Sequence, residues 1–232
     1  MRDKYKGQTY FEARSNSVQA DIDKYSKLVE EVVRTKGMRF EGVKNGYALI
    51  TVLYQNKINL MYSLGCEPAD IRSTFLSMLP YYTEGWTPDN SYFDLIKTLS
   101  LAVLLNVKDE KSINLLLEKT IQADYHDRMV CVLAGQLDPS YPQNTQTFLW
   151  ENTYQPLIAV LESRDTGMLR EYLEKQWARI HRTCPWYGTH NSDIYNGYWS
   201  FEAGAAAKIA RLDDRELCGA AYYPYDLVHT DL

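Results

Sequence analysis

The chain has 232 residues, of which 45% are hydrophobic and 24% are charged, as in ordinary globular proteins. This length suits one large domain or two small ones with a sizeable core. No run of 18 apolar residues occurs, which argues against a membrane-spanning helix. The charged residues 1–6 lack the apolar core of a secretory signal, so we expect a cytoplasmic protein.

Charge is unevenly distributed along the chain. Residues 1–105 carry 13 Lys and Arg against 12 Asp and Glu, whereas residues 106–232 carry 12 against 18. The acidic C-terminal half argues against direct binding of nucleic acid, because Lys and Arg are the residues that bind phosphates. It suits a basic protein partner, although an acidic excess is also typical of an ordinary solvated surface.

Cysteine and aromatic residues restrict the chemistry further. The four cysteines, at positions 66, 131, 184 and 218, are far apart and form no CxxC pair, which fits a reducing compartment. The 19 tyrosines and five tryptophans fit either an aromatic core or a protein interface.

Apolar residues recur at helical spacing through most of the chain. In the N-terminal half they predict a helix that ends at Gly37, a second that ends at Gly65, and a third that begins at Pro68. The sequence Thr87–Pro88 is typical of another helix start. Residues 101–105 of that helix are apolar on all sides, which predicts a central position in the core.

In the C-terminal half, helices are predicted near residues 146–163, 165–183 and 192–212. In the last of these, Ile194 and Tyr198 are expected to share one face. No alternating run predicts a strand. We therefore expect an all-α fold of antiparallel helical hairpins in a bundle, without significant sheet.

A change in charge balance near residues 106–110 predicts a domain boundary. An N-terminal helical domain is expected over residues 1–107 and a C-terminal helical domain over 108–232, packed together as one compact unit.

The sequence contains no P-loop, GxGxxG, GxSxG or HExxH motif. His181, Cys184 and His190 could supply zinc ligands or a nucleophile with its base, but a structural zinc site needs about four ligands. A helix end followed by an aromatic turn explains the same residues. We expect no catalytic residue, no metal and no cofactor.

Glu202 stands among aromatic and small residues, so its carboxylate is expected to be partly buried. A buried carboxylate can act as a general acid or base. More often it is a structural acceptor held by Tyr, Trp or backbone donors. We favour the structural role, because no second carboxylate stands at a plausible partner position.

The C-terminal residues carry a resemblance to a known family. The run Tyr198-Trp-Ser-Phe-Glu-Ala-Gly-Ala-Ala-Ala-Lys-Ile209, then Leu212-Asp-Asp, then Tyr222-Tyr-Pro-Tyr-Asp-Leu227, resembles the C-terminal signature of the PoNi immunity proteins. Trp186-Tyr187 and His190 resemble the approach to it, and residues 21–33 resemble the family's N-terminal helical domain. The signature residues, which we interpret as determinants of the fold, are Tyr198, Trp199, Phe201, Glu202, Tyr222, Tyr223, Pro224, Tyr225 and Asp226.

The resemblance implies a role. PoNi proteins are all-helical cognate immunity proteins for PoNe toxins, which are DNases of the PD-(D/E)xK type delivered by contact-dependent bacterial secretion systems. It therefore implies a cytoplasmic inhibitor without enzymatic activity whose partner is a DNase toxin, with no direct contact to nucleic acid or membrane. The sequence is also compatible with a homodimer.

A DNase presents a cationic groove to the phosphate backbone, so an acidic surface could occupy that groove. The candidate contacts are acidic residues near helix ends that look exposed: Asp124, Asp127, Asp138, Glu151, Asp193, Asp213 and Asp214. Two alternatives stay open. One is a helical scaffold for other protein partners, and the other is a hydrolase that uses Glu202 and His190.

Overall fold

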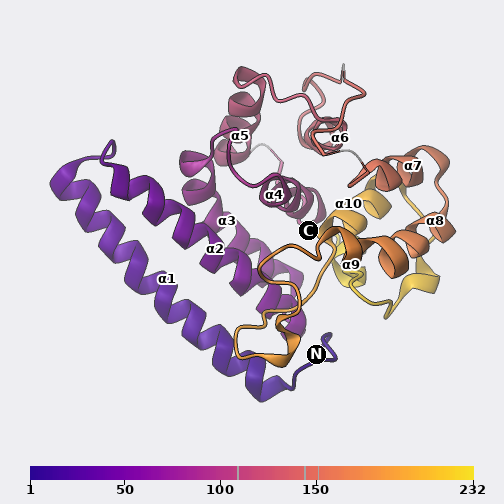
Figure 1. Cartoon of the computed structure of the whole chain (residues 1–232), viewed down its shortest axis with the longest axis horizontal. Helices are drawn as coiled ribbons and strands as arrows, with labels where there is room; N and C mark the ends of the chain where they lie inside the picture. Colours follow the sequence, from indigo (N-terminus) through magenta and orange to yellow (C-terminus); the bar gives the residue numbers. More distant parts are fainter. Residues whose placement is uncertain (109, 144, 151) are drawn as a thin grey trace. The chain divides into compact units, whose positions relative to one another are not determined.

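The computed structural model describes the whole chain except residues 109, 144 and 151 (Figure 1). The described residues form helices joined by turns and loops and contain no β-strand, which confirms the all-α fold. No helix in this part of the chain is long and apolar enough to span a bilayer. The contacts define two compact units: residues 1–86 with 188–198 form unit 1, and residues 87–187 with 199–232 form unit 2. The expected division between residues 107 and 108 stays a prediction.

Three long helices build unit 1. Helices α1 (Gln8–Lys36) and α2 (Glu41–Leu64) form a hairpin, and α3 (Pro68–Gly85) packs against α2 (Figure 1). The predicted helix ends are confirmed. Gly37 and Gly65 follow α1 and α2 with φ angles of 82° and 91°, which glycine adopts at no steric cost.

The segment 188–198 belongs to unit 1 and lies against the start of α1. Apart from the 3-10 turn η2 (Thr189–Asn191), it is irregular. The Tyr10 hydroxyl donates to the carbonyl of Tyr195 (2.9 Å), and the Tyr195 hydroxyl donates to Oδ2 of Asp3 (2.6 Å). Arg14 also donates to the side-chain oxygen of Asn196 (3.2 Å). These bonds join residues far apart in the sequence.

The predicted helix over residues 192–212 is therefore wrong in its first half. Gly197 has a φ of 104°, which a right-handed helix does not permit, and the helix begins only at Phe201. Ile194 was expected to share one helical face with Tyr198, but it is 59% exposed whereas Tyr198 is buried. Apolar spacing predicted the helix, and hydrogen bonds between distant segments override it.

Unit 2 contains the shorter helices. They are α4 (Tyr92–Leu104), α5 (Lys111–Gln122), α6 (Arg128–Leu137), α7 (Gln155–Ser163), α8 (Thr166–Glu171), α9 (Trp177–Ile180), α10 (Phe201–Ala210) and α11 (Tyr225–Val228), with the π turn η1 (Tyr172–Gln176) and the 3-10 turn η3 (Arg215–Leu217). Helix α4 packs against α6 and α10, and Leu99, Leu101 and Leu104 are fully buried, as the apolar run predicts. The Lys208 ammonium group donates to the carbonyl of Leu104 (2.8 Å), which joins α10 to the end of α4.

Two helix starts lie later than predicted. Helix α4 begins at Tyr92, and the hydroxyl of the preceding Ser91 caps it by accepting a hydrogen bond from a backbone amide. The expected start at Thr87 is instead a turn, in which the Thr87 hydroxyl donates to the side-chain oxygen of Asn90 (3.0 Å). Helix α7 begins at Gln155 rather than near residue 146, and Pro156 lies in its first turn, the position in a helix that proline favours.

Gly204 allows the C-terminal segment to lie directly on α10. A Cβ atom at this position would lie 2.6 Å from Cγ of Pro224, in a ring that cannot rotate away. We predict that Gly204→Ala lowers the free energy of unfolding by about 1–3 kcal/mol through overpacking, measured by urea denaturation.

Gly85 is the matched control for this substitution. A Cβ atom there would make an ordinary contact of 3.4 Å with Cβ of Tyr47. Gly85→Ala should therefore leave the stability unchanged or slightly raised. Equal stability of the two variants would contradict the close approach at Gly204.

Candidate functional site

The candidate site lies in unit 2, where a π turn interrupts a helix. Asp165 caps α8 by accepting a hydrogen bond from the amide of Gly167 (2.7 Å). The turn η1 follows α8 and leads directly into α9, and such π turns are frequent at functional sites. It buries Tyr172 and Leu173 and leaves Glu174 exposed.

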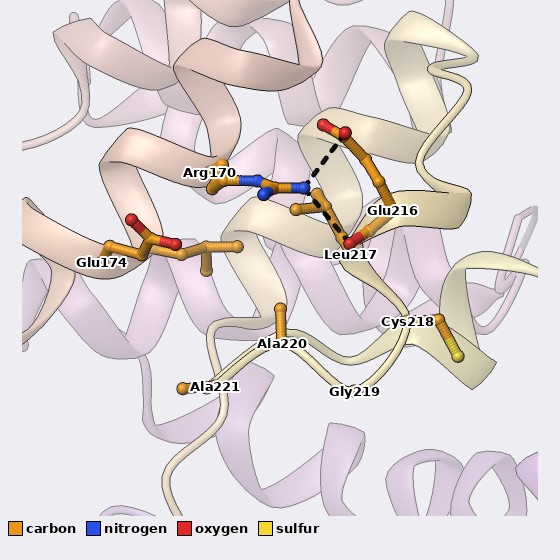
Figure 2. Close-up of a pocket in the computed structure, with 9 residues that line it drawn as sticks. Arg170, Glu174, Glu216, Leu217, Cys218, Gly219, Ala220 and Ala221 are labelled. Carbon is orange, nitrogen blue, oxygen red and sulfur yellow. Dashed lines mark hydrogen bonds and ion pairs between the residues drawn. The ribbon is translucent and has the colours of Figure 1, made fainter.

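A pocket of about 320 Å³ opens beside this turn (Figure 2). Its lining consists of Arg170, Leu173, Glu174 and residues 216–221. Residues 219–221 are Gly-Ala-Ala, and such small side chains leave space between the loop and the helix. The pocket is therefore bounded by one helical segment and by one loop that follows α10.

The charges around the pocket do not balance. The Arg170 guanidinium lies 3.1 Å from Oε2 of Glu216 and also donates to the backbone carbonyl of Glu216 (3.3 Å). Both side chains are about half exposed, so this ion pair contributes only about 0–1 kcal/mol to stability. Glu174 makes no ion pair with any described residue. The pocket thus carries two carboxylates and one guanidinium.

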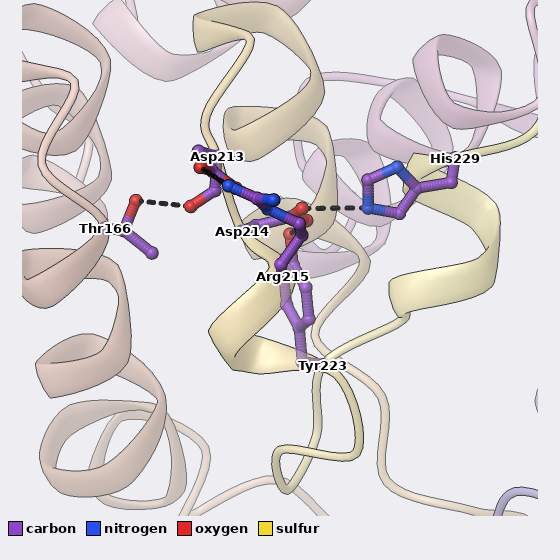
Figure 3. A network of polar contacts seen from close by, with 6 residues as sticks. All are labelled: Thr166, Asp213, Asp214, Arg215, Tyr223 and His229. Carbon is purple, nitrogen blue, oxygen red and sulfur yellow. Dashed lines mark hydrogen bonds and ion pairs between the residues drawn. The ribbon is translucent and has the colours of Figure 1, made fainter.

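Asp213 and Asp214 follow α10 and have opposite environments (Figure 3). Asp214 is 1% exposed, accepts from the Tyr223 hydroxyl (2.5 Å) and binds Nε2 of His229 (2.8 Å). Asp213 is exposed, and two hydrogen bonds from Arg215 (2.5 and 2.7 Å) lower the pKa of its carboxyl. The expected exposure is therefore wrong for Asp214, because this residue holds the C-terminal segment in place.

Asp127 is also buried, contrary to the expectation that it is exposed. One oxygen caps α6 by accepting from the amide of Val130 (2.9 Å). The other accepts from the Tyr92 hydroxyl and from the amide of Leu149, both at 2.9 Å. Burial, followed by the charge of Asp127, raises the pKa of Tyr92 strongly. Asp127 therefore joins α4, α6 and the loop before α7, and a partner cannot reach it.

The remaining predicted contacts are scattered. Asp124 is exposed and pairs with His126 (2.7 Å), and Asp138 is half-buried and accepts from Ser140 in a turn. Asp193 is exposed in unit 1, and Glu151 lies outside the described residues.

Among the predicted contacts that the structure describes, Asp213 is exposed and lies in the loop that leads to the pocket. Thr166 donates to the Asp213 carbonyl (3.2 Å), and Arg170, one turn further along α8, binds Glu216. The same contact between α8 and the loop after α10 therefore positions both Asp213 and the pocket.

Glu202 occupies the interior of unit 2 and is 5% exposed. Its Oε1 accepts hydrogen bonds from Nε1 of Trp177 (2.8 Å), from the hydroxyl of Ser200 (2.8 Å) and from the hydroxyl of Tyr172 (3.2 Å). Burial raises the pKa of Tyr172, and the charge of Glu202 raises it further. Burial also lowers the pKa of the nearby Lys97 to about 8. Three donors on one oxygen agree with the structural role that the sequence favours.

The other signature residues are mostly parts of the same interior. Tyr222 has a φ of 67°, its carbonyl accepts from the Ser200 amide (2.7 Å), and its ring stacks on Trp177 with centroids 4.4 Å apart. Phe201, Tyr223 and Pro224 are buried, Trp199 and Tyr225 are half-buried, Asp226 is exposed, and Tyr198 is buried in unit 1.

The histidines and cysteines do not form a metal site in the described part of the chain, where no group of three or more candidate ligands gathers. His181 is buried, and its Nδ1 lies 2.8 Å from the carbonyl of Trp177. Cys184 belongs to unit 2, whereas His190 belongs to unit 1 and lies 3.4 Å from the Tyr198 hydroxyl.

Sequence reasoning missed Arg170, Glu174 and Glu216. The spacing of Arg170 and Glu174 is the i, i+4 pattern of any exposed helix face, so it does not mark a site. The pocket exists because the loop after α10 lies against that face, and a single sequence carries no signal for this contact.

We predict that Asp127→Ala lowers the free energy of unfolding by about 2–4 kcal/mol, because it removes a helix cap and leaves buried donors without an acceptor. Thermal unfolding measures the loss. The control is Glu118→Ala, a change at an exposed residue of α5 in the same unit, which should stay within about 0.5 kcal/mol of the wild type. Identical melting of both variants would show that Asp127 is not a buried acceptor.

Substitution of Glu202 separates a structural from a catalytic role. Glu202→Ala removes the acceptor that three buried donors share and should cost about 3 kcal/mol in urea denaturation. Glu202→Gln retains an acceptor oxygen, so the free energy of unfolding should fall clearly less than in Glu202→Ala. If Glu202→Ala unfolds like the wild type, the structural account of this residue is wrong.

Comparisons with known proteins agree with this architecture. A family model described as "PoNe immunity protein (PoNi), N-terminal" matches residues 2–116, and one described as "PoNe immunity proteins (PoNi), C-terminal" matches residues 125–227. No curated protein matches the chain. The crystal structure of protein PA2201 from Pseudomonas aeruginosa is similar, with a TM-score of 0.63 over 92% of this chain and 87% of that one. Its sequence identity of 18% supports the fold alone.

The two family models follow one another along the chain and together span nearly all of it. The chain therefore belongs to the family of PoNe immunity proteins (PoNi), a membership that implies a toxin-neutralising immunity function.

Proposed function

We propose that this protein binds a cognate DNase toxin delivered by a bacterial secretion system and inhibits it in the cytoplasm. Inhibition results from coverage of the toxin's cationic DNA-binding groove by an acidic face of unit 2. Family membership supports the neutralising role. The acidic face consists of Glu174, Glu216 and Asp213 and is centred on the pocket beside η1.

The uncompensated negative charge of the pocket is the observation that carries this proposal. A nuclease needs Lys and Arg to bind the phosphates of DNA. A long cationic side chain that enters the pocket would meet Glu174, which has no cationic partner among the described residues. Small side chains at 219–221 leave room for it. Such complementarity raises the association rate and the specificity more than the affinity.

The first test is co-purification of this protein with the product of the adjacent gene, followed by a DNA-cleavage assay. A stable complex that suppresses cleavage supports the proposal. If the two proteins do not associate and cleavage continues, the proposed inhibition of this toxin is wrong.

Charge reversal tests the face itself. We predict that the double variant Glu174→Lys with Asp213→Lys slows association with the toxin by about tenfold or more at low salt. The difference from the wild type should shrink as salt is added, because exposed charges are screened. Stopped-flow fluorescence measures the rate.

Glu118→Lys is the control, since Glu118 is exposed on α5 in the same unit. It reverses one charge, against two in the double variant, and should therefore have far less than half of the effect. Equal slowing by both variants would indicate general charge steering without a specific face, and no slowing would place the interface elsewhere. Asp214 is unsuitable for reversal, because its burial makes the loss of folding the first consequence.

A further inference from the structure

A second concavity, of about 370 Å³, lies in unit 1 between α1, α2 and α3. Its walls include the half-buried rings of Tyr47 on α2 and Tyr81 on α3, beside Val33 of α1. Both tyrosines pack against a buried cluster of Val29, Val43 and Ile50, and their ring centroids lie 5.5 Å apart at an interplanar angle of 75°. The walls are therefore fixed by packing, and the groove is pre-formed.

The rim of this groove is acidic. Glu30 and Glu84 are exposed there, and Glu30 forms no ion pair with any described residue. Arg34 also lies on the rim, but its guanidinium is 3.9 Å from Glu31, and both side chains are mostly exposed.

The charge of Glu84 acts within the groove. Burial raises the pKa of Tyr47, and the charge of Glu84 is the next cause. The Tyr47 hydroxyl therefore lies in the electric field of the Glu84 carboxylate, and the aromatic wall and the acidic rim form one site. Tyrosine rings attract cations at their faces, and carboxylates bind them at their oxygens.

We infer that this groove binds the side chain of an arginine from a basic segment of a protein partner. A guanidinium is planar, stacks on aromatic rings and pairs with carboxylates, whereas lysine offers a compact charge that stacks less well. The identification of that partner as the toxin rests on the proposed function. The arginine site itself lies in a different unit from the acidic face and requires only the groove.

A small probe tests the groove without the toxin. The full-length protein with isotope-labelled tyrosines is titrated with the blocked tripeptide Gly-Arg-Gly and followed by NMR. The matched probe carries citrulline in place of arginine, which keeps the shape and removes the charge. The arginine peptide should shift the Tyr47 and Tyr81 signals saturably, and the citrulline peptide should bind at least tenfold more weakly.

The double variant Glu30→Gln with Glu84→Gln should reduce the affinity for the arginine peptide by at least tenfold while the protein stays folded, which its circular dichroism spectrum checks. Glu67→Gln is the control, since Glu67 is exposed in the same unit and makes no side-chain cap bond to α3. A response that is absent, equal for both peptides, or unaffected by the double variant overturns the site.

The same double variant is then mixed with the toxin. Weaker toxin binding supports the assignment of the partner, and unchanged binding together with a positive peptide result overturns that assignment. If the wild type forms no complex with the toxin while the peptide still binds, the proposed function fails and the arginine site stands.

Discussion

The structure of unit 2 depends on the hydrogen bonds that the buried carboxylate of Glu202 accepts. Its donors Tyr172 and Trp177 belong to the π turn and to α9, and Ser200 precedes α10. Ser200 in turn binds the carbonyl of Tyr222 through its amide. A single buried acceptor thus connects the π turn, the start of α10 and the C-terminal segment, and a buried charge is tolerated because it is hydrogen-bonded.

This connection also shapes the candidate site. Tyr172 points inward to Glu202, and two residues later Glu174 is exposed at the pocket. The opposite wall is the loop after α10, which Asp214 holds through Tyr223 and His229. The buried carboxylates of Glu202 and Asp214 therefore hold the two walls of the pocket where the carboxylate of Glu174 is exposed. Substitutions in the interior should therefore change the shape of the pocket.

The fold was more predictable from sequence than the site. Glycines with left-handed φ angles and a proline in a first turn act locally, so Gly37, Gly65 and Pro68 mark helix limits correctly. The apolar run at 101–105 correctly predicts a central helix. The irregular segment 188–198 was missed, because it is fixed by Tyr10, Arg14 and other residues remote in sequence.

Acidic residues show why the site resists prediction. Asp124 and Asp127 are three positions apart, yet one is exposed and the other fully buried. Asp213 and Asp214 are neighbours with the same contrast. The net charge of the chain counts these four aspartates equally, whereas the two exposed aspartates dominate the electric field that a partner meets at the surface. Which acid is buried depends on donors such as Tyr92 and Tyr223, and only the folded chain brings them together.

The central claim is that an acidic face of this immunity protein docks on a cationic toxin. The most direct test is the association rate constant of the wild-type protein with its toxin, measured over a series of salt concentrations. The account predicts a rate that is fast at low salt and falls steeply as salt is added, while dissociation changes little. A rate that does not depend on salt would contradict electrostatic docking and would require an apolar interface instead.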